Sequence, residues 1–167
     1  MSAKLSLLVV FLLVGCTMTN DPAVPTSSII APTPNVQRWQ DANPVMQGIC
    51  FAAAADAAGR VFVLRSAAEL QQFYDLADNS RLCRRPVMRG AFEFTEGRVL
   101  AGLWSTGTGC TARHDTARYE KTASTLTIDL TFVTEGACGY ELVRPFWIAL
   151  ENAAQHEILI NVGRGGG

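Results

Sequence analysis

The segment from Thr125 to Thr134, whose apolar and polar residues alternate as far as Phe132, is the feature that most restricts the possible folds of this 167-residue chain. Successive side chains of a β-strand point to opposite faces of the sheet. A sheet with one face on a core and the other in water is usually antiparallel. The segment therefore predicts a half-buried antiparallel strand. Its apolar face is Leu126, Ile128, Leu130 and Phe132, and its polar face is Thr125, Thr127, Asp129 and Thr131.

Four further segments are predicted as strands of the same sheet. Residues 60–65 and 99–104 are short apolar runs of strand length, and residues 141–150 and 157–162 supply two more. Pro145 lies inside one of them. Proline has no N–H to give to a ladder, so we expect Pro145 at a sheet edge or a bulge.

One helix is predicted after the strand at residues 60–65. Ser66 and Glu69 form a capping box, in which the serine oxygen accepts a backbone N–H and the glutamate reaches back. Leu70, Phe73, Tyr74 and Ala77 then recur at the spacing of a helical core face. We expect the helix to end near Asp78-Asn79.

These elements predict an α+β fold, with one helix packed on a mainly antiparallel sheet of about six strands. The predicted domain covers residues 38–163, and residues 164–167 are expected to form a flexible tail.

The N-terminus predicts export and lipidation. Lys4 precedes an apolar run that is too short for the roughly 20 residues of a membrane-spanning helix. A positive charge before such a run is typical of a secretory signal. Leu13-Val14-Gly15-Cys16 resembles a lipobox, which implies cleavage after residues 1–15 and a lipid on Cys16. The alternative is an ordinary signal peptide with a chance cysteine.

Residues 16–37 are predicted to be a disordered tether between the lipid and the domain, because prolines and small polar residues dominate them. Thr17 stands where aspartate often retains a lipoprotein in the inner membrane. The resemblance therefore implies the outer membrane of the cell envelope if the host has two membranes.

Four cysteines follow Cys16 and predict two disulfides, because an exported chain meets an oxidising compartment. Of the three possible pairings, we favour Cys50–Cys83 with Cys110–Cys138. A zinc site is the alternative, but the chain has no Cys-x-x-Cys pair. We expect no metal and no cofactor.

The sequence offers no catalytic constellation, so we expect a non-enzyme. His114 is followed by Asp115, but neighbouring side chains in a strand point to opposite faces. There is no Gly-x-Ser-x-Gly motif and no phosphate-binding loop, and His156 is expected to be exposed. The net charge of −1 does not favour nucleic acid as a partner.

Two segments are the predicted contacts with a partner protein. The first is expected to be an exposed loop. The second is expected to expose at least one of its two aromatic rings beside an arginine, and these residue types are enriched at interface hot spots. The alternatives are a tight turn beside a disulfide, and two rings that lie in the core. The segments are Thr106, Gly107, Thr108 and Gly109, and Arg144, Pro145, Phe146 and Trp147.

An arginine cluster around Cys83 suggests a binding site for an anionic envelope polymer, because guanidinium groups match carboxylates and phosphates. The alternative is a solvated loop partly paired with acids. The cluster consists of Arg81, Arg84, Arg85 and Arg89.

The order of these elements over residues 61–162 is similar to the C-terminal domain of the lipoprotein subunit of the chymotrypsin-like protease complex. The shared features are the capped helix, the strand at residues 99–104, the Thr-Gly segment and Pro145-Phe146-Trp147. The family's Thr-Gly-Gly-Tyr pattern is replaced here, since Cys110 follows Gly109. The resemblance implies a non-catalytic accessory domain that binds another envelope protein.

Arg144-Pro145-Phe146-Trp147 is also similar to the Arg-Pro-Trp loop of chagasin-type cysteine protease inhibitors, with Phe146 inserted. That resemblance implies a protease inhibitor. A structural envelope protein that binds an anionic polymer is the third expectation.

Overall fold

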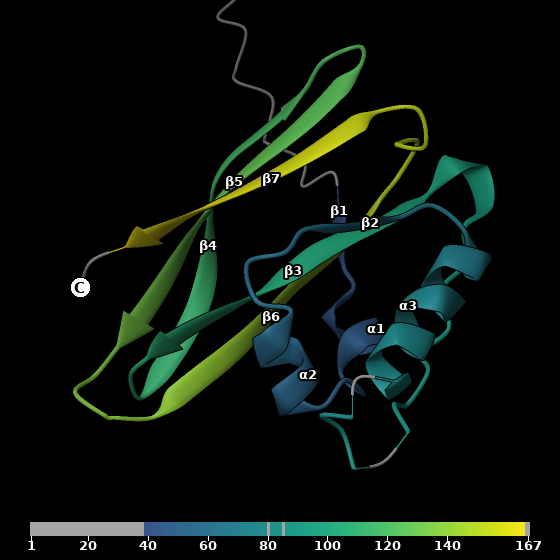
Figure 1. The fold of residues 1–167 in the computed structure, drawn as a ribbon. Helices are drawn as coiled ribbons and strands as arrows, with labels where there is room; N and C mark the ends of the chain where they lie inside the picture. The colour runs from purple at the N-terminus through teal and green to yellow at the C-terminus, as the bar shows by residue number, and fades with distance from the viewer. Residues whose placement is uncertain (1–38, 80, 85, 166–167) are drawn as a thin grey trace, which may run out of the picture. The chain divides into compact units, whose positions relative to one another are not determined.

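The computed structural model describes residues 39–79, 81–84 and 86–165. These residues form seven strands, three α-helices and one 3-10 helix, shown in Figure 1. The strands are β1 (Trp39–Asp41), β2 (Phe62–Leu64), β3 (Val99–Thr108), β4 (Thr111–Lys121), β5 (Thr125–Glu135), β6 (Glu141–Leu150) and β7 (Glu157–Gly165). The helices are α1 (Asn43–Met46), α2 (Phe51–Asp56) and α3 (Ala67–Asn79), and the 3-10 helix is η1 (Thr95–Gly97). The predicted α+β, mainly β fold is confirmed.

The strands form two sheets, where the sequence predicted one. The first sheet has the order β1-β6-β3-β2 and is antiparallel throughout. Its centre is the ladder between β3 and β6, which runs from Val99 opposite Leu150 to Thr108 opposite Glu141.

The second sheet has the order β4-β5-β7, and its β5–β7 pair is parallel, an exception to the predicted antiparallel pattern. The chain leaves β5, crosses to the first sheet as β6 and returns as β7. Parallel neighbours need such a crossover, and here a strand of the opposite sheet supplies it.

The strand β3 is buried on both faces, which explains its continuous apolar run. Leu100 and Trp104 face the helices, together with Phe73 of α3. Val99 and Leu103 face the second sheet, in a core with strands β5, β6 and β7. The first sheet is therefore the middle of three layers, with helices on one face and the second sheet on the other (Figure 1).

The helix α3 begins as the sequence predicted. The N–H of Glu69 donates to Ser66 Oγ at 3.2 Å, and the Glu69 carboxylate accepts the N–H of Arg65. Leu70, Phe73 and Tyr74 are buried under it, as the helical spacing indicated.

Pro145 occupies a sheet edge, as expected. The strand β1 pairs with Ile148–Leu150, and among the described strands none lies beside β6 on that side at Pro145. Opposite Pro145, the carbonyl of Trp104 accepts the N–H of Gly59 at 2.9 Å and so points away from β6. The missing N–H of Pro145 therefore removes no ladder hydrogen bond.

The predicted flexible tail at residues 164–167 is wrong for its first two residues. The parallel ladder continues until Val133 lies opposite Gly165, so Arg164 and Gly165 belong to β7. Residues 166–167 lie outside the described residues.

Candidate binding site

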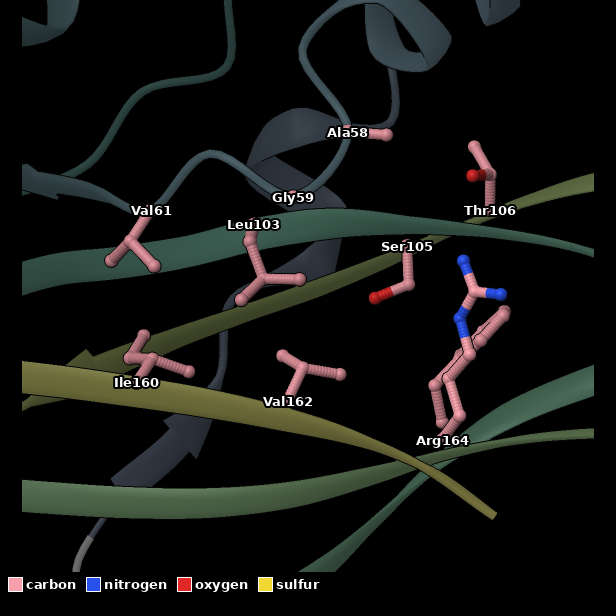
Figure 2. A pocket seen from close by; sticks show the side chains of 10 residues that line it. Ala58, Gly59, Val61, Leu103, Ser105, Thr106, Ile160, Val162 and Arg164 are labelled. Carbon is pink, nitrogen blue, oxygen red and sulfur yellow. The ribbon is translucent and has the colours of Figure 1, made fainter. Parts of the chain in front are cut away.

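A slot of about 330 Å³ opens at one side of the sandwich, between β3 and β7. Figure 2 shows Leu103 and Ser105 of β3 pointing into it from one side, and Ile160 and Val162 of β7 from the other. Ala58, Gly59, Val61 and Phe132 complete its wall, in which apolar side chains outnumber polar ones while polar and apolar atoms share the surface about equally. We call this space the interlayer slot.

One end of the interlayer slot is polar. Arg164 reaches from β7 toward Ser105 and Thr106 of β3 (Figure 2). Within the described residues, the Arg164 side chain has no hydrogen-bond or ion-pair partner. The slot therefore combines apolar side chains with two hydroxyls and an unpaired guanidinium.

A hydrogen bond between the two sheets closes the inner side of this end. His114 Nε2 of β4 lies 2.9 Å from Ser105 Oγ, and Ser105 is 8% exposed. The imidazole contacts the rings of Phe132 and Phe146, whose centroids lie 5.0 Å and 5.6 Å away. Burial lowers the pKa of His114 to about 4, although the charge of Asp115 acts in the opposite direction.

Among the residues that the structure describes, no acid hydrogen-bonds to His114 to orient its imidazole. Asp115 accepts a hydrogen bond at 2.9 Å from Arg113, which also pairs with Glu135. A serine nucleophile needs a base that a third group orients. The sequence did not predict this pair, because β4, which carries His114, was not predicted as a strand.

The predicted contact segments lie side by side, but the first is not a loop. Thr106, Gly107 and Thr108 extend β3, and Thr106 pairs with Val143 just after Ser105 pairs with Arg144. The ladder to β6 holds these residues in extended conformation. Only Gly109 lies in the turn, where its N–H donates to the carbonyl of Tyr140 at 3.1 Å.

The expectation that at least one of Phe146 and Trp147 is exposed is wrong. Phe146 is 9% exposed and lies between the sheets, and Trp147 is fully buried under the helices. The two faces of β6 are both covered, so each ring enters one of the two cores. Arg144 is half-buried, and its guanidinium donates to the carbonyl of Val143 at 3.1 Å.

A second pocket of about 420 Å³ opens on the other side of the sandwich, where β6 extends beyond β1. Arg144, Pro145 and His114 line it together with Trp39 and Arg113. The polar pair inside the sandwich is thus flanked by one pocket on each side.

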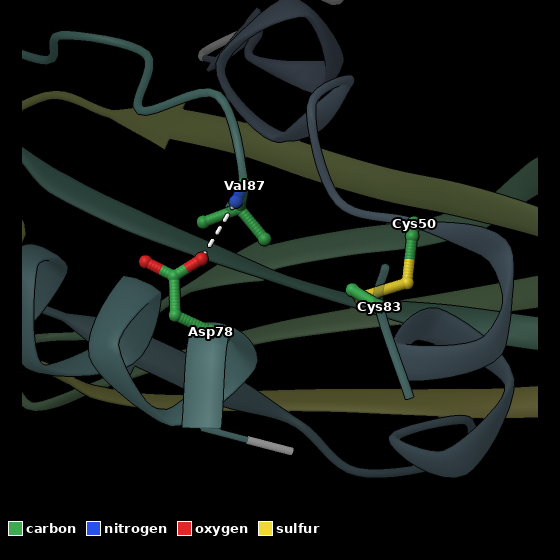
Figure 3. Close-up of a disulfide and its surroundings, with 4 residues drawn as sticks. All are labelled: Cys50, Asp78, Cys83 and Val87. Atoms are coloured by element: carbon green, nitrogen blue, oxygen red, sulfur yellow. Dashed lines mark hydrogen bonds between the residues drawn. A yellow bond between two sulfur atoms is a disulfide. The ribbon is translucent and has the colours of Figure 1, made fainter. Parts of the chain in front are cut away.

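Both predicted disulfides are confirmed. Cys50 and Cys83 are bonded with Cα atoms 5.9 Å apart, and Cys110 and Cys138 with Cα atoms 4.8 Å apart. Figure 3 shows the first beside the end of α3, where Asp78 accepts the N–H of Val87 at 2.6 Å. The disulfide and this hydrogen bond fix the segment that follows α3.

The arginine cluster does not present four free guanidinium groups. Arg89 pairs with Asp75 and Asp78, both at 2.7 Å. Arg81 and Arg84 are exposed, and Arg85 lies outside the described residues. The support for an anionic polymer site is therefore weaker than the sequence suggested.

The structure bears on the predicted lipid anchor and on metal binding only within the residues that it describes. Cys16, the signal segment and the tether lie outside the described residues. Among the residues that the structure describes, no helix is long and apolar enough to cross a membrane, and no group of His, Cys, Asp and Glu is placed to hold a metal.

Comparisons of the chain with known protein families, with curated proteins and with solved structures found no match. The two family resemblances therefore remain predictions from the sequence.

Proposed function

We propose that this protein is a lipid-anchored lipoprotein of the bacterial cell envelope, and that its domain binds another envelope protein through the interlayer slot. The observation that carries the proposal is the unpaired Arg164 at the end of an open slot that apolar side chains also line. An accessible apolar surface with a few convergent polar groups is the usual form of a binding site.

Two further features support a binding role. The lipobox-like segment at Cys16 and the proline-rich residues 17–37 suit a domain held on a tether at a membrane. The slot also lies next to Thr106, one of the residues predicted to contact a partner.

We also propose that the domain is not catalytic. A histidine with a pKa of about 4 is a weak base at neutral pH, and Asp115 is bonded to Arg113. The efficiency of a general base depends on a pKa close to the working pH. The His114–Ser105 pair is better suited to joining the two sheets.

The inhibitor alternative has less support from the fold. It requires an aromatic contact at Phe146 and Trp147, and both rings are buried.

The test is chemical crosslinking in the native cells, followed by recovery of the tagged chain and mass spectrometry. Val162 and Leu159 provide a matched pair on β7, since they are 39% and 41% exposed and point to opposite faces of the sheet. We expect Leu159→Lys to recover the same partner as the wild-type chain, and Val162→Lys to lose it. Equal recovery with both variants would show that the partner binds elsewhere.

A further inference from the structure

We propose that the slot receives an extended, acidic segment of the partner polypeptide, which adds to the free edge of β7 as a new strand. This inference rests on the proposed function and names the ligand of its site. Three independent features of the slot support it: unpaired strand edges, exposed apolar side chains and an unpaired cation.

The first feature is the edge of β7. Among the described strands, β7 pairs with β5 on one side and with no strand on the other. Such an edge presents alternate N–H and C=O groups to a further strand. Proline, lysine and bulges commonly protect edges, but Glu157–Gly165 contains neither residue type and pairs with β5 without a bulge.

The edge of β3 on the opposite side of the slot is also open. The strand β2 ends its pairing at Gly102, and Gly59 supplies one hydrogen bond to the carbonyl of Trp104. Backbone groups of a strand point to the same side at every second residue. The N–H and C=O of Thr106 therefore face the slot side of β3, where no described strand pairs with them.

The second feature is exposed apolar surface between these edges. Val61 is 42% exposed and Val162 is 39% exposed, and both line the slot. A strand added beside β7 would direct every second side chain into the slot. Apolar side chains at those positions would cover both valines, and strand addition of this kind is a known mode of peptide recognition.

The third feature is Arg164, which selects the charge of the partner. A guanidinium matches a carboxylate with two parallel hydrogen bonds. A second copy of β7 would not supply that carboxylate, because its inward-facing residues are Ile158, Ile160, Val162 and Arg164. An inward charge also discourages edge-to-edge pairing between copies. The site therefore favours a different, acidic segment.

The experiment is selection of random decapeptides, displayed with blocked termini, on the full chain. We expect the bound peptides to alternate apolar and polar residues, with an aspartate or glutamate at a fixed inward position. Synthetic copies of these peptides should bind Arg164→Ala about tenfold more weakly than the wild-type chain. They should bind the control Arg84→Ala, another exposed arginine, without change.

Two further probes test the geometry. N-methylation of alternate peptide nitrogens should abolish binding in one register and leave it unchanged in the other, because only one set of N–H groups meets β7. We expect the Arg164→Glu variant to regain peptide binding when lysine replaces the acidic residue of the peptide.

The inference would be overturned by peptides without an acid, by binding that ignores Arg164, or by a failure to select any peptide. If Val162→Lys still abolished partner recovery in cells, such a failure would leave the proposed function standing. Self-association of Arg164→Ala with unchanged peptide binding would assign Arg164 to edge protection alone.

Discussion

At the scale of single residues, the His114–Ser105 hydrogen bond is a polar contact between a strand of each sheet. A histidine whose pKa falls on folding favours the neutral form in the folded state. Its stabilising contribution is therefore present above the unfolded pKa of about 6.5 and is lost as the pH falls toward 4.

We predict that the free energy of unfolding decreases between pH 6.5 and pH 4, and that His114→Gln reduces this decrease. Glutamine can still bond to Ser105 but does not titrate. The measurement is urea unfolding at a series of pH values. The wild-type chain, measured in parallel, is the reference for the full decrease. An NMR titration of His114 with a pKa near 6.5 would contradict the prediction.

Gly102 shows how closely β3 and β6 approach. A Cβ atom there would lie 2.2 Å from the carbonyl oxygen of Phe146 and 2.6 Å from Cδ2 of Trp147. Both atoms belong to the middle layer and its buried indole, so neither can move without disturbing a core.

We predict that Gly102→Ala lowers the free energy of unfolding by about 3 kcal/mol, the upper range for overpacking. Gly163→Ala is the control, because its Cβ would lie 3.7 Å from the nearest atom. Thermal or urea unfolding of both variants measures the difference. Equal stabilities would mean that the strands are less tightly packed than described.

At the scale of elements, the sequence predicted those whose residues carry a clear periodic or capping signal. Residues 125–134 and the Ser66–Glu69 cap behave as predicted, because each depends on local chemistry. The strand β4 was not predicted, since its residues are polar on both faces and its pairing with β5 is decided by the hairpin. Short α2 has no side-chain cap at Cys50 and relies on packing.

The two disulfides close loops of similar length, with sequence separations of 33 and 28 residues. Loop-closure entropy then predicts that each bridge contributes about 3 to 4 kcal/mol to the free energy of unfolding. We expect the double variants Cys50→Ala/Cys83→Ala and Cys110→Ala/Cys138→Ala to lose comparable amounts in urea unfolding. A loss of stability in only one of the two double variants would contradict this prediction. It would show that strain in the folded state or residual structure in the unfolded state outweighs the loop-closure entropy.

At the scale of the whole molecule, the candidate binding site comes from the arrangement of the layers. Thr106 was predicted as a contact and does line the slot, but Arg164 was assigned to a tail. Its glycine-rich surroundings resemble a flexible end, and only the parallel ladder with β5 places it in a strand. Phe146 and Trp147 were misjudged because a strand between two cores buries both of its faces.

The membrane anchor is a prediction for the whole chain. We expect the Cys16→Ser variant to keep its signal segment uncleaved. We also expect it to be lost from the lipid-modified membrane fraction, because the thiol of Cys16 carries the lipid. Metabolic labelling with an alkyne fatty acid, followed by fractionation, measures both effects. Unchanged labelling of the Cys16→Ser variant would contradict the predicted lipid attachment at Cys16.

The most direct test of the central claim is photo-crosslinking in the native cells from a single residue of β7. A photoreactive amino acid at Val162 faces the interlayer slot, and one at Leu159 faces the opposite side of the sheet. We expect a discrete crosslinked partner from position 162 and none from position 159. We also expect the Arg164→Ala variant to lose the product at position 162. The same product from both positions, or from position 159 alone, would contradict the account.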